Sequence, residues 1–243
     1  MRRHIAHTPS GEAGWPAWGP EGREPVLFHD RTEAGEILAD DLAGRLTRPC
    51  VVAAVPRGGV IVGLPVAERL RAPLTVLYAQ KLTVPQAPEL AIGAIDEDGY
   101  ATVDPEAVKR LGLGSGEIEA ARVRVWDEIR RRMDLYRVPP LSAYLPGLEV
   151  ILVDDGVATG LTLHAALSYA RYHGAARVLV AAPCASALGA ERFSAEADLF
   201  VSPVVRRDFP AVGDYYEDFS PVEDDAVIAA LARANTHQKL PGF

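Results

Sequence analysis

The stretch VILVDDGVATGLT, residues 150–162, indicates the fold of this chain. Its four leading apolar residues predict a buried strand, and two acids, Asp154 and Asp155, follow at the end of that strand. The turn after the acids is rich in glycine and threonine and leads into a predicted helix. Aligned amides at a helix start favour an anion by about 0.3–1 kcal/mol before direct hydrogen bonds are counted. The stretch therefore predicts a phosphate cradle beside two carboxylates.

The two acids call for a different ligand group, because a carboxylate repels a phosphate. Vicinal sugar hydroxyls donate hydrogen bonds, and a charge-assisted bond of this kind is worth about 1.5–3 kcal/mol. The two acids and the phosphate cradle together predict that the ligand contains a phosphorylated ribose. Asp154 and Asp155 are predicted to bind the hydroxyls of the sugar. The residues predicted to bind its 5′-phosphate are Gly156, Val157, Ala158, Thr159, Gly160, Leu161 and Thr162.

Other interpretations of the stretch explain less of it. A Walker-type loop needs a lysine where Leu161 stands. An aspartyl-phosphate enzyme needs a second acid two residues after the nucleophile, where Val157 stands. A receiver domain carries its paired acids on its first strand and has no glycine–threonine turn. A simple helix cap at Asp155 or Thr159 accounts for one residue of the motif.

Composition narrows the class of protein. The 243 residues are 49% hydrophobic and can bury one generous core, and the aromatic content of 7% is typical of an α/β protein rich in Ala, Val and Leu. A net charge of -8 argues against a nonspecific nucleic-acid binder, because no excess of cations is available to neutralise phosphates.

The ends and the cysteines suggest an intracellular protein. Residues 1–25 predict a loosely attached tail and contain no apolar segment of the secretory type. No window approaches the ~20 apolar residues of a membrane span. Cys50 and Cys184 lie in apolar stretches and predict buried free thiols. We therefore expect a cytoplasmic protein without a membrane partner.

Strands and helices alternate along most of the chain, which predicts an α/β fold with one parallel β-sheet flanked by helices. The expected strands are 50–55, 74–79, 149–153, 177–182 and 198–201. The expected helices are 30–46, 63–71, one ending near 173, 186–195 and 222–234. Residues 26–243 are predicted to form a single domain.

Two segments interrupt the alternation. Residues 80–90 contain two prolines and predict a loop, after which 91–95 and 100–103 predict a strand pair around an acidic turn. Helices at 105–111 and 115–137 predict a helical insertion over about 104–140, and the arginines of the longer helix predict a solvated face. Residues 202–222 predict an irregular, aromatic-rich segment.

Three segments follow predicted strands and should meet at one edge of the sheet. They are PRGG at 56–59, QKLTVP at 80–85 and the motif at 154–162. Ligands of open parallel sheets bind at the carboxyl ends of the strands. The expected meeting of the three segments at one edge of the sheet favours a single ligand site.

The stretch VILVDDGVATGLT resembles the phosphoribosyl pyrophosphate signature of type I phosphoribosyltransferases, with Gly156 in place of the usual aliphatic residue. VPRGGVIVG at 55–63 is similar to the pyrophosphate loop of this family, which implies pyrophosphate binding by Arg57, Gly58 and Gly59. Lys81 matches the lysine of the Arg-Lys pair that precedes a mobile loop in the family, whereas Gln80 replaces the arginine.

Three further stretches resemble a bacterial group of this family whose acceptor is unassigned. They are DRTEAGEILA at 30–39, PELAIGA at 88–94 and DFPAVGDYYEDF at 208–219. The resemblance implies a C-terminal hood at 202–222, with Phe209 as a candidate for the base pocket. It also implies catalytic roles for Asp154, Asp155 and Lys81, and Mg²⁺ held mainly by the donor and its waters beside the two acids.

The resemblance implies transfer of phosphoribose from phosphoribosyl pyrophosphate to a nitrogenous base or amine, with release of pyrophosphate. An alternative is a non-catalytic regulator that binds phosphoribosyl pyrophosphate or a nucleotide. A third hypothesis is a hydrolase or phosphorylase of phosphorylated ribosides. The partners implied are small molecules, and a homodimer is compatible with the sequence.

Overall fold

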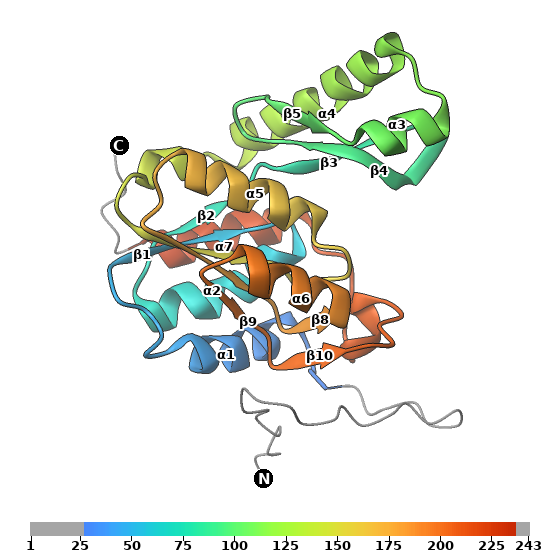
Figure 1. The fold of residues 1–243 in the computed structure, drawn as a ribbon. Helices are drawn as coiled ribbons and strands as arrows, with labels where there is room; N and C mark the ends of the chain where they lie inside the picture. The colour runs from blue at the N-terminus through green and yellow to red at the C-terminus, as the bar shows by residue number, and fades with distance from the viewer. Residues whose placement is uncertain (1–26, 237–243) are drawn as a thin grey trace.

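Five parallel strands form the central sheet of the computed structural model, which describes residues 27–236, with the backbone alone at 88 and 89 (Figure 1). Every residue of β1 and β6 is buried, as expected for strands covered on both faces. In spatial order the strands are β2 Leu74–Val76, β1 Cys50–Ala54, β6 Glu149–Val153, β7 Arg177–Ala181 and β9 Leu199–Val201. The predicted parallel sheet is confirmed.

Helices cover both faces of this sheet. Along β1, Val52 and Ala54 pack into one core and Val51 and Ala53 into the other. The helices on the first face are α1 Arg31–Leu42, α2 Gly58–Leu70 and α7 Asp224–Asn235. The helices on the second are α5 Leu161–Tyr172, α6 Ala187–Glu196 and the short η1 Leu141–Tyr144.

The strand order reverses between β1 and β6. The chain leaves β1 toward β2 on one side and returns later to β6 on the other, in register from Cys50–Glu149 to Ala54–Val153. Segments that follow these two strands therefore diverge from adjacent points at one edge of the sheet. Such a switch point is where open α/β sheets bind ligands.

A second lobe is inserted between β2 and η1 and stands to one side of the central sheet in Figure 1. Its strands are antiparallel and comprise β3 Gln80–Val84, β4 Ala87–Ile95 and β5 Ala101–Val103. Its helices are α3 Pro105–Leu111 and α4 Ser115–Tyr136. The structure contains both predicted helices and the predicted pair around the acidic turn.

The loop predicted over residues 80–90 is wrong, because residues 80–84 form β3 and pair with β4. Leu82 and Val84 alternate into the core, and the carbonyl of Thr83 accepts a bond of 2.6 Å from Arg124 on α4. Burial under α4 therefore outweighs the proline signal at the ends of the strand.

The C-terminal segment is more regular than predicted. β8 Cys184–Ser186 and β10 Val204–Arg206 form a small parallel sheet, and η2 Val212–Tyr215 follows. Its core includes Phe28, Tyr215 and Tyr216, and an isolated bridge joins Phe28 to Tyr216. We call residues 202–222 the hood.

Several element boundaries differ from the prediction, including those of α2, β2 and α1. α2 begins at Gly58 instead of 63, since its two leading glycines belong to the first helical turn. β2 ends at Val76 instead of 79, and α1 ends at Leu42 instead of 46 because Ala43 has an extended ψ of 127°.

The cysteines, the helices and the N-terminal tail were also the subject of sequence predictions. Cys50 and Cys184 are buried and unpaired, as predicted. No helix within residues 27–236 is both long and apolar enough to cross a membrane. The predicted tail at 1–25 lies outside the described residues.

Candidate functional site

A side chain from α1 binds one of the two acids that follow β6. Asp155 follows β6, and its Oδ2 accepts a bond of 2.9 Å from Nε of Arg31. The Arg31 side chain is 10% exposed and that of Asp155 is 18% exposed, so this ion pair is largely withdrawn from water. Arg31 also donates to the carbonyl of Ser220 at 3.0 Å, and its guanidinium lies 3.8 Å from the ring centre of Phe219. Asp155 is therefore held by a side chain that is itself fixed from the hood.

Sequence reasoning missed Arg31, because a charged residue in the first turn of a helix is usually exposed. A signal was present in the motifs. Arg31 belongs to DRTEAGEILA, and Phe219 and Tyr216 belong to DFPAVGDYYEDF. Tyr216 donates to the carbonyl of Asp155 at 2.6 Å, so both group-specific motifs converge on the same aspartate.

The second acid, Asp154, is half-buried behind the first. Its Oδ1 accepts a bond of 2.9 Å from the amide of Asp155. Burial and the neighbouring charge of Asp155 raise the pKa of Asp154 well above its usual range, while the positive charge of Lys81 acts in the opposite direction. Lys81 is exposed at the start of β3 and thus contributes to the electrostatics of the acid pair, from a strand and not from the predicted loop.

The N-terminus of α2 lies directly against the acid pair. A Cβ atom at Gly58 would lie 1.9 Å from Oδ2 of Asp155, and one at Gly59 would lie 3.0 Å from Cα of Asp154. Only glycine fits such close approach at position 58. The two glycine amides are thereby placed at a helix start beside the carboxylates, where an anion is favoured.

Arg57 caps α2 on the same side of the site. The peptide bond between Pro56 and Arg57 is cis. The guanidinium of Arg57 contacts Oε2 of Glu223, the residue before α7, at 3.4 Å. The structure thus brings the predicted Arg57, Gly58 and Gly59 together with Asp154 and Asp155.

The turn after the acids is braced through its carbonyl groups. The carbonyls of Val157 and Ala158 accept bonds of 2.8 Å and 2.6 Å from the amide and hydroxyl of Ser186, and Arg192 donates to the carbonyl of Thr159 at 2.9 Å. The amides of residues 158–160 donate to no other residue within 27–236. Carbonyls bound to the protein and unpartnered amides suit an anion cradle at the start of α5.

Two glycines of this turn have separate structural reasons. Gly160 precedes α5 with a φ of 69°, which favours glycine. At Gly156 the reason is space, because a Cβ atom would lie 2.5 Å from Cγ1 of Val212 in the hood and 3.0 Å from Sγ of Cys184. Val212 and Cys184 thus occupy the space that a side chain at position 156 would need.

Phe209 lies in the hood and packs against its small core. Its ring stacks on Tyr215 with centroids 4.9 Å apart and an interplanar angle of 21°. The side chain of Phe209 is half-buried. Its role in a base pocket stays a prediction.

The acid pair offers hard oxygen atoms suited to Mg²⁺. Residues 27–236 contain no cluster of three or more His, Cys, Asp or Glu side chains that could hold a metal ion. One oxygen of Asp155 is also engaged by Arg31. The carboxylate oxygens of Asp154 and the second oxygen of Asp155 are therefore the protein atoms that could contact such an ion beside a bound ligand.

The central sheet, the acid pair at its switch point and the braced turn define an α/β protein with a strand-end ligand site. Residues 31–208 match the model of the phosphoribosyl transferase domain. The chain belongs to this family.

The names of proteins with similar sequences agree with this family assignment. The candidate phosphoribosyl transferase Rv0571c of Mycobacterium tuberculosis is 41% identical over 209 residues, which cover 86% of this chain and 47% of that protein. The chain thus spans about half the length of the curated relative. An adenine phosphoribosyltransferase of Rhodospirillum rubrum is 36% identical over 92 residues, covering 35% of this chain and 52% of that protein.

A solved structure shows the same fold. The protein TT1426 from Thermus thermophilus superposes with a TM-score of 0.71 at 42% sequence identity, covering 85% of this chain and 98% of that one. The match supports the arrangement of the central sheet and its helices.

Proposed function

We propose that this protein transfers phosphoribose from phosphoribosyl pyrophosphate to a nitrogenous base or amine. The observation that carries the proposal is the meeting of two segments at the switch point between β1 and β6, the start of α2 and the stretch 154–162. The acid pair, the braced turn at 156–162 and the start of α2 match, in turn, the hydroxyls, the 5′-phosphate and the pyrophosphate of that donor. Family membership supports the same donor.

In the proposed reaction, a nitrogen atom of the acceptor forms a bond to C1 of the ribose as the bond from C1 to the pyrophosphate oxygen breaks. The bonding electron pair leaves with pyrophosphate, and the acceptor nitrogen loses its proton to solvent. Asp154 and the second carboxylate oxygen of Asp155 bind the ribose hydroxyls and stabilise positive charge that develops on the sugar ring. Arg31 keeps Asp155 in the orientation that this task needs.

The two phosphate ends of the donor bind at separate elements. The amides and hydroxyls from Gly156 to Thr162 hold the 5′-phosphate, and Arg57 with the amides of Gly58 and Gly59 binds the leaving pyrophosphate. Lys81 adds a second cation beside Asp154. Mg²⁺, when bound with the donor beside the acid pair, screens the negative charge of pyrophosphate.

Phe209 offers an aromatic ring in the hood as a stacking partner for a base. The relative from Rhodospirillum rubrum is named for adenine, so adenine heads the acceptors to be tried.

The test measures pyrophosphate release from phosphoribosyl pyrophosphate with Mg²⁺ and one candidate acceptor at a time, from purines and pyrimidines to simple amines. We expect release that depends on one acceptor class. Lys81→Met should slow this release by about a hundredfold, because a group that stabilises leaving charge contributes on that scale. Lys109→Met, on α3 in the second lobe, is the matched control and should keep the wild-type rate.

Three results would count against transfer. Tight binding of the donor without release under any acceptor favours the regulator. Release without an acceptor favours the hydrolase. A wild-type protein that does not bind the donor at all would remove the basis of the site assignment.

A further inference from the structure

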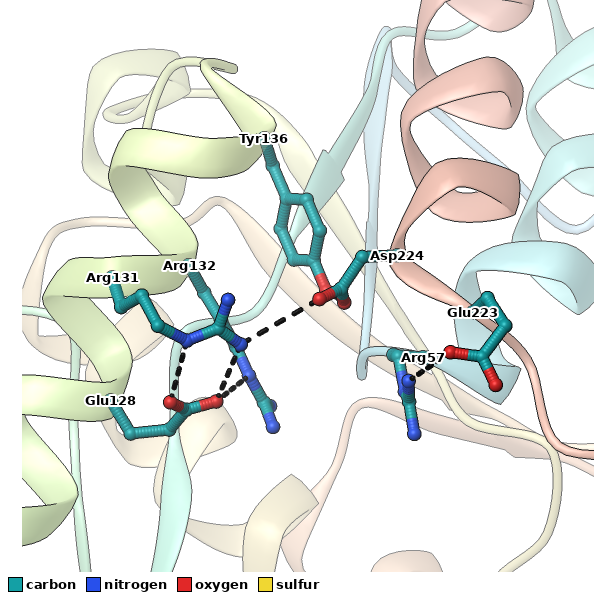
Figure 2. A network of polar contacts seen from close by, with 7 residues as sticks. All are labelled: Arg57, Glu128, Arg131, Arg132, Tyr136, Glu223 and Asp224. Carbon is teal, nitrogen blue, oxygen red and sulfur yellow. Dashed lines mark hydrogen bonds and ion pairs between the residues drawn. The ribbon is translucent and has the colours of Figure 1, made fainter.

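The last turn of α4 is fixed to the start of α7. Tyr136 donates to Oδ1 of Asp224 at 2.6 Å, and Arg131 lies 3.6 Å from Oδ2 of the same residue (Figure 2). Asp224 directly follows Glu223, which contacts Arg57. These contacts place the end of α4 beside the segment that follows β1, although the two are far apart in the sequence.

Arg132 lies at this junction with part of its guanidinium unengaged. Its Nε donates to Oε1 of Glu128 at 2.8 Å, and its two terminal nitrogen atoms have no partner among residues 27–236. Arg131 differs, because Glu128 accepts from both its Nε and a terminal nitrogen. The bonds from Arg131 and Arg132 lower the pKa of Glu128 to about 2, so this acid stays ionised and holds both arginines.

Arg132 and Arg57 flank the same contact. In Figure 2 the side chain of Arg132 lies on the α4 side of the bond between Tyr136 and Asp224, and that of Arg57 lies on the side of Glu223. Both guanidinium groups are directed toward the bottom of the view. Burial and the bond to Asp224 raise the pKa of Tyr136, and the positive charges of Arg132 and Arg57 both act against that rise. The side chains of Arg132 and Arg57 are 22% and 39% exposed, so both remain accessible to a ligand.

The site of the proposed function has a need that Arg132 can meet. Pyrophosphate carries several negative charges and is bound best by forked donors. Position 80 carries glutamine and supplies no charge, which leaves Arg57 before α2 and Lys81 on β3 as the cations that follow β1 and β2 in the chain.

We propose that Arg132 is a pyrophosphate-binding residue, supplied by the second lobe in place of a cation at position 80. The inference rests on the proposed function and deepens it. Glu128 holds Arg132 by one edge and leaves its two terminal nitrogen atoms for the phosphate oxygens. The second lobe thereby contributes to the ligand site from α4 as well as from β3.

The experiment compares Arg132→Gln with Arg130→Gln by calorimetric titration. Arg130 is the matched control, since it lies on the same helix, pairs with Asp127 and is 60% exposed. The ligands are phosphoribosyl pyrophosphate with Mg²⁺, pyrophosphate with Mg²⁺, and ribose 5-phosphate. Arg132→Gln should weaken binding of the first two by about tenfold or more, because it removes charge-assisted bonds. Its binding of ribose 5-phosphate should equal that of wild type, and Arg130→Gln should match wild type throughout.

A second variant separates the guanidinium from the network around it. Glu128→Gln keeps Arg132 but weakens its anchor, and we expect pyrophosphate binding to be retained. A loss equal to that of Arg132→Gln would overturn the inference, because it would show that the network matters and the guanidinium does not.

The two proposals fail in different ways. If wild type binds phosphoribosyl pyrophosphate and pyrophosphate, and Arg132→Gln binds both equally well, the assignment of Arg132 is overturned while the proposed function stands. If wild type binds none of the three ligands, the proposed function fails and the assignment fails with it.

Discussion

Arg31, which pairs with Asp155 at the edge of the central sheet, and the arginines on α4 differ in how far their ion pairs are buried. Arg31 and Asp155 are 10% and 18% exposed, and their pair orients an acid of the site. On α4, the pairs of Arg122 with Glu119 and of Arg130 with Asp127 are one helical turn apart and mostly exposed. A run of arginines in the sequence therefore says less about the site than one arginine in a short motif. Among the three consecutive arginines of α4, we assign only Arg132 to the ligand.

The largest expected effect separates the two kinds of pair. Asp155→Asn should lower the free energy of unfolding by about 3 kcal/mol, because it leaves the buried charge of Arg31 without the opposite charge that faces it. Glu119→Gln removes one partner of an exposed pair and should leave that free energy nearly unchanged. Denaturant unfolding of both variants measures the difference. Equal effects would mean that the pair at the sheet edge is no more buried in solution than the pair on α4.

A smaller effect is expected from the close approach of α2 to the acid pair. Gly58→Ala should destabilise the protein by about 1–3 kcal/mol, since its Cβ would overlap Oδ2 of Asp155 and must displace it. Gly116→Ala is the control on α4, where nothing lies within 4 Å of the added carbon. That control should stabilise the helix by about 0.5–1 kcal/mol. The melting temperatures should thus move in opposite directions, and a shift of the same sign would contradict the packing described for position 58.

The smallest effect concerns the contact of the second lobe with the core. Glu97, in the turn between β4 and β5, is buried and accepts bonds of 3.3 Å and 3.0 Å from the amides of Leu141 and Ser142 at η1. Burial raises the pKa of this carboxyl, so the folded protein binds its proton more tightly than the unfolded chain does. The stability of wild type should then fall as pH rises above the ordinary carboxyl value of about 4.3.

Glu97→Gln removes that titration. Unfolding curves for both proteins as pH rises from about 4 to neutrality should show wild type losing stability relative to the variant. A difference that stays constant over this range would mean that Glu97 is solvated in the folded protein.

The central sheet could be predicted because its valine-rich runs have few other uses in a chain of this composition. β3 could not, because its burial depends on α4, whose first residue lies 31 positions after the last residue of β3 (115 minus 84). The acid pair and the turn at 154–162 were predictable because motif and strand end coincide within one stretch. Arg31 was not, since it reaches Asp155 from a helix whose placement only the fold determines, and the same holds for the position on α4 from which we propose that Arg132 acts.

The contact between Gly156 and Val212 has a consequence for related sequences. One volume beside the acid pair is filled by a single aliphatic group, which here comes from the hood and not from the loop. A relative that carries valine or leucine at the position of Gly156 should carry a small residue at the position of Val212. Aligned sequences of the group should therefore show these two positions varying together in size, and a designer who enlarges the first must reduce the second.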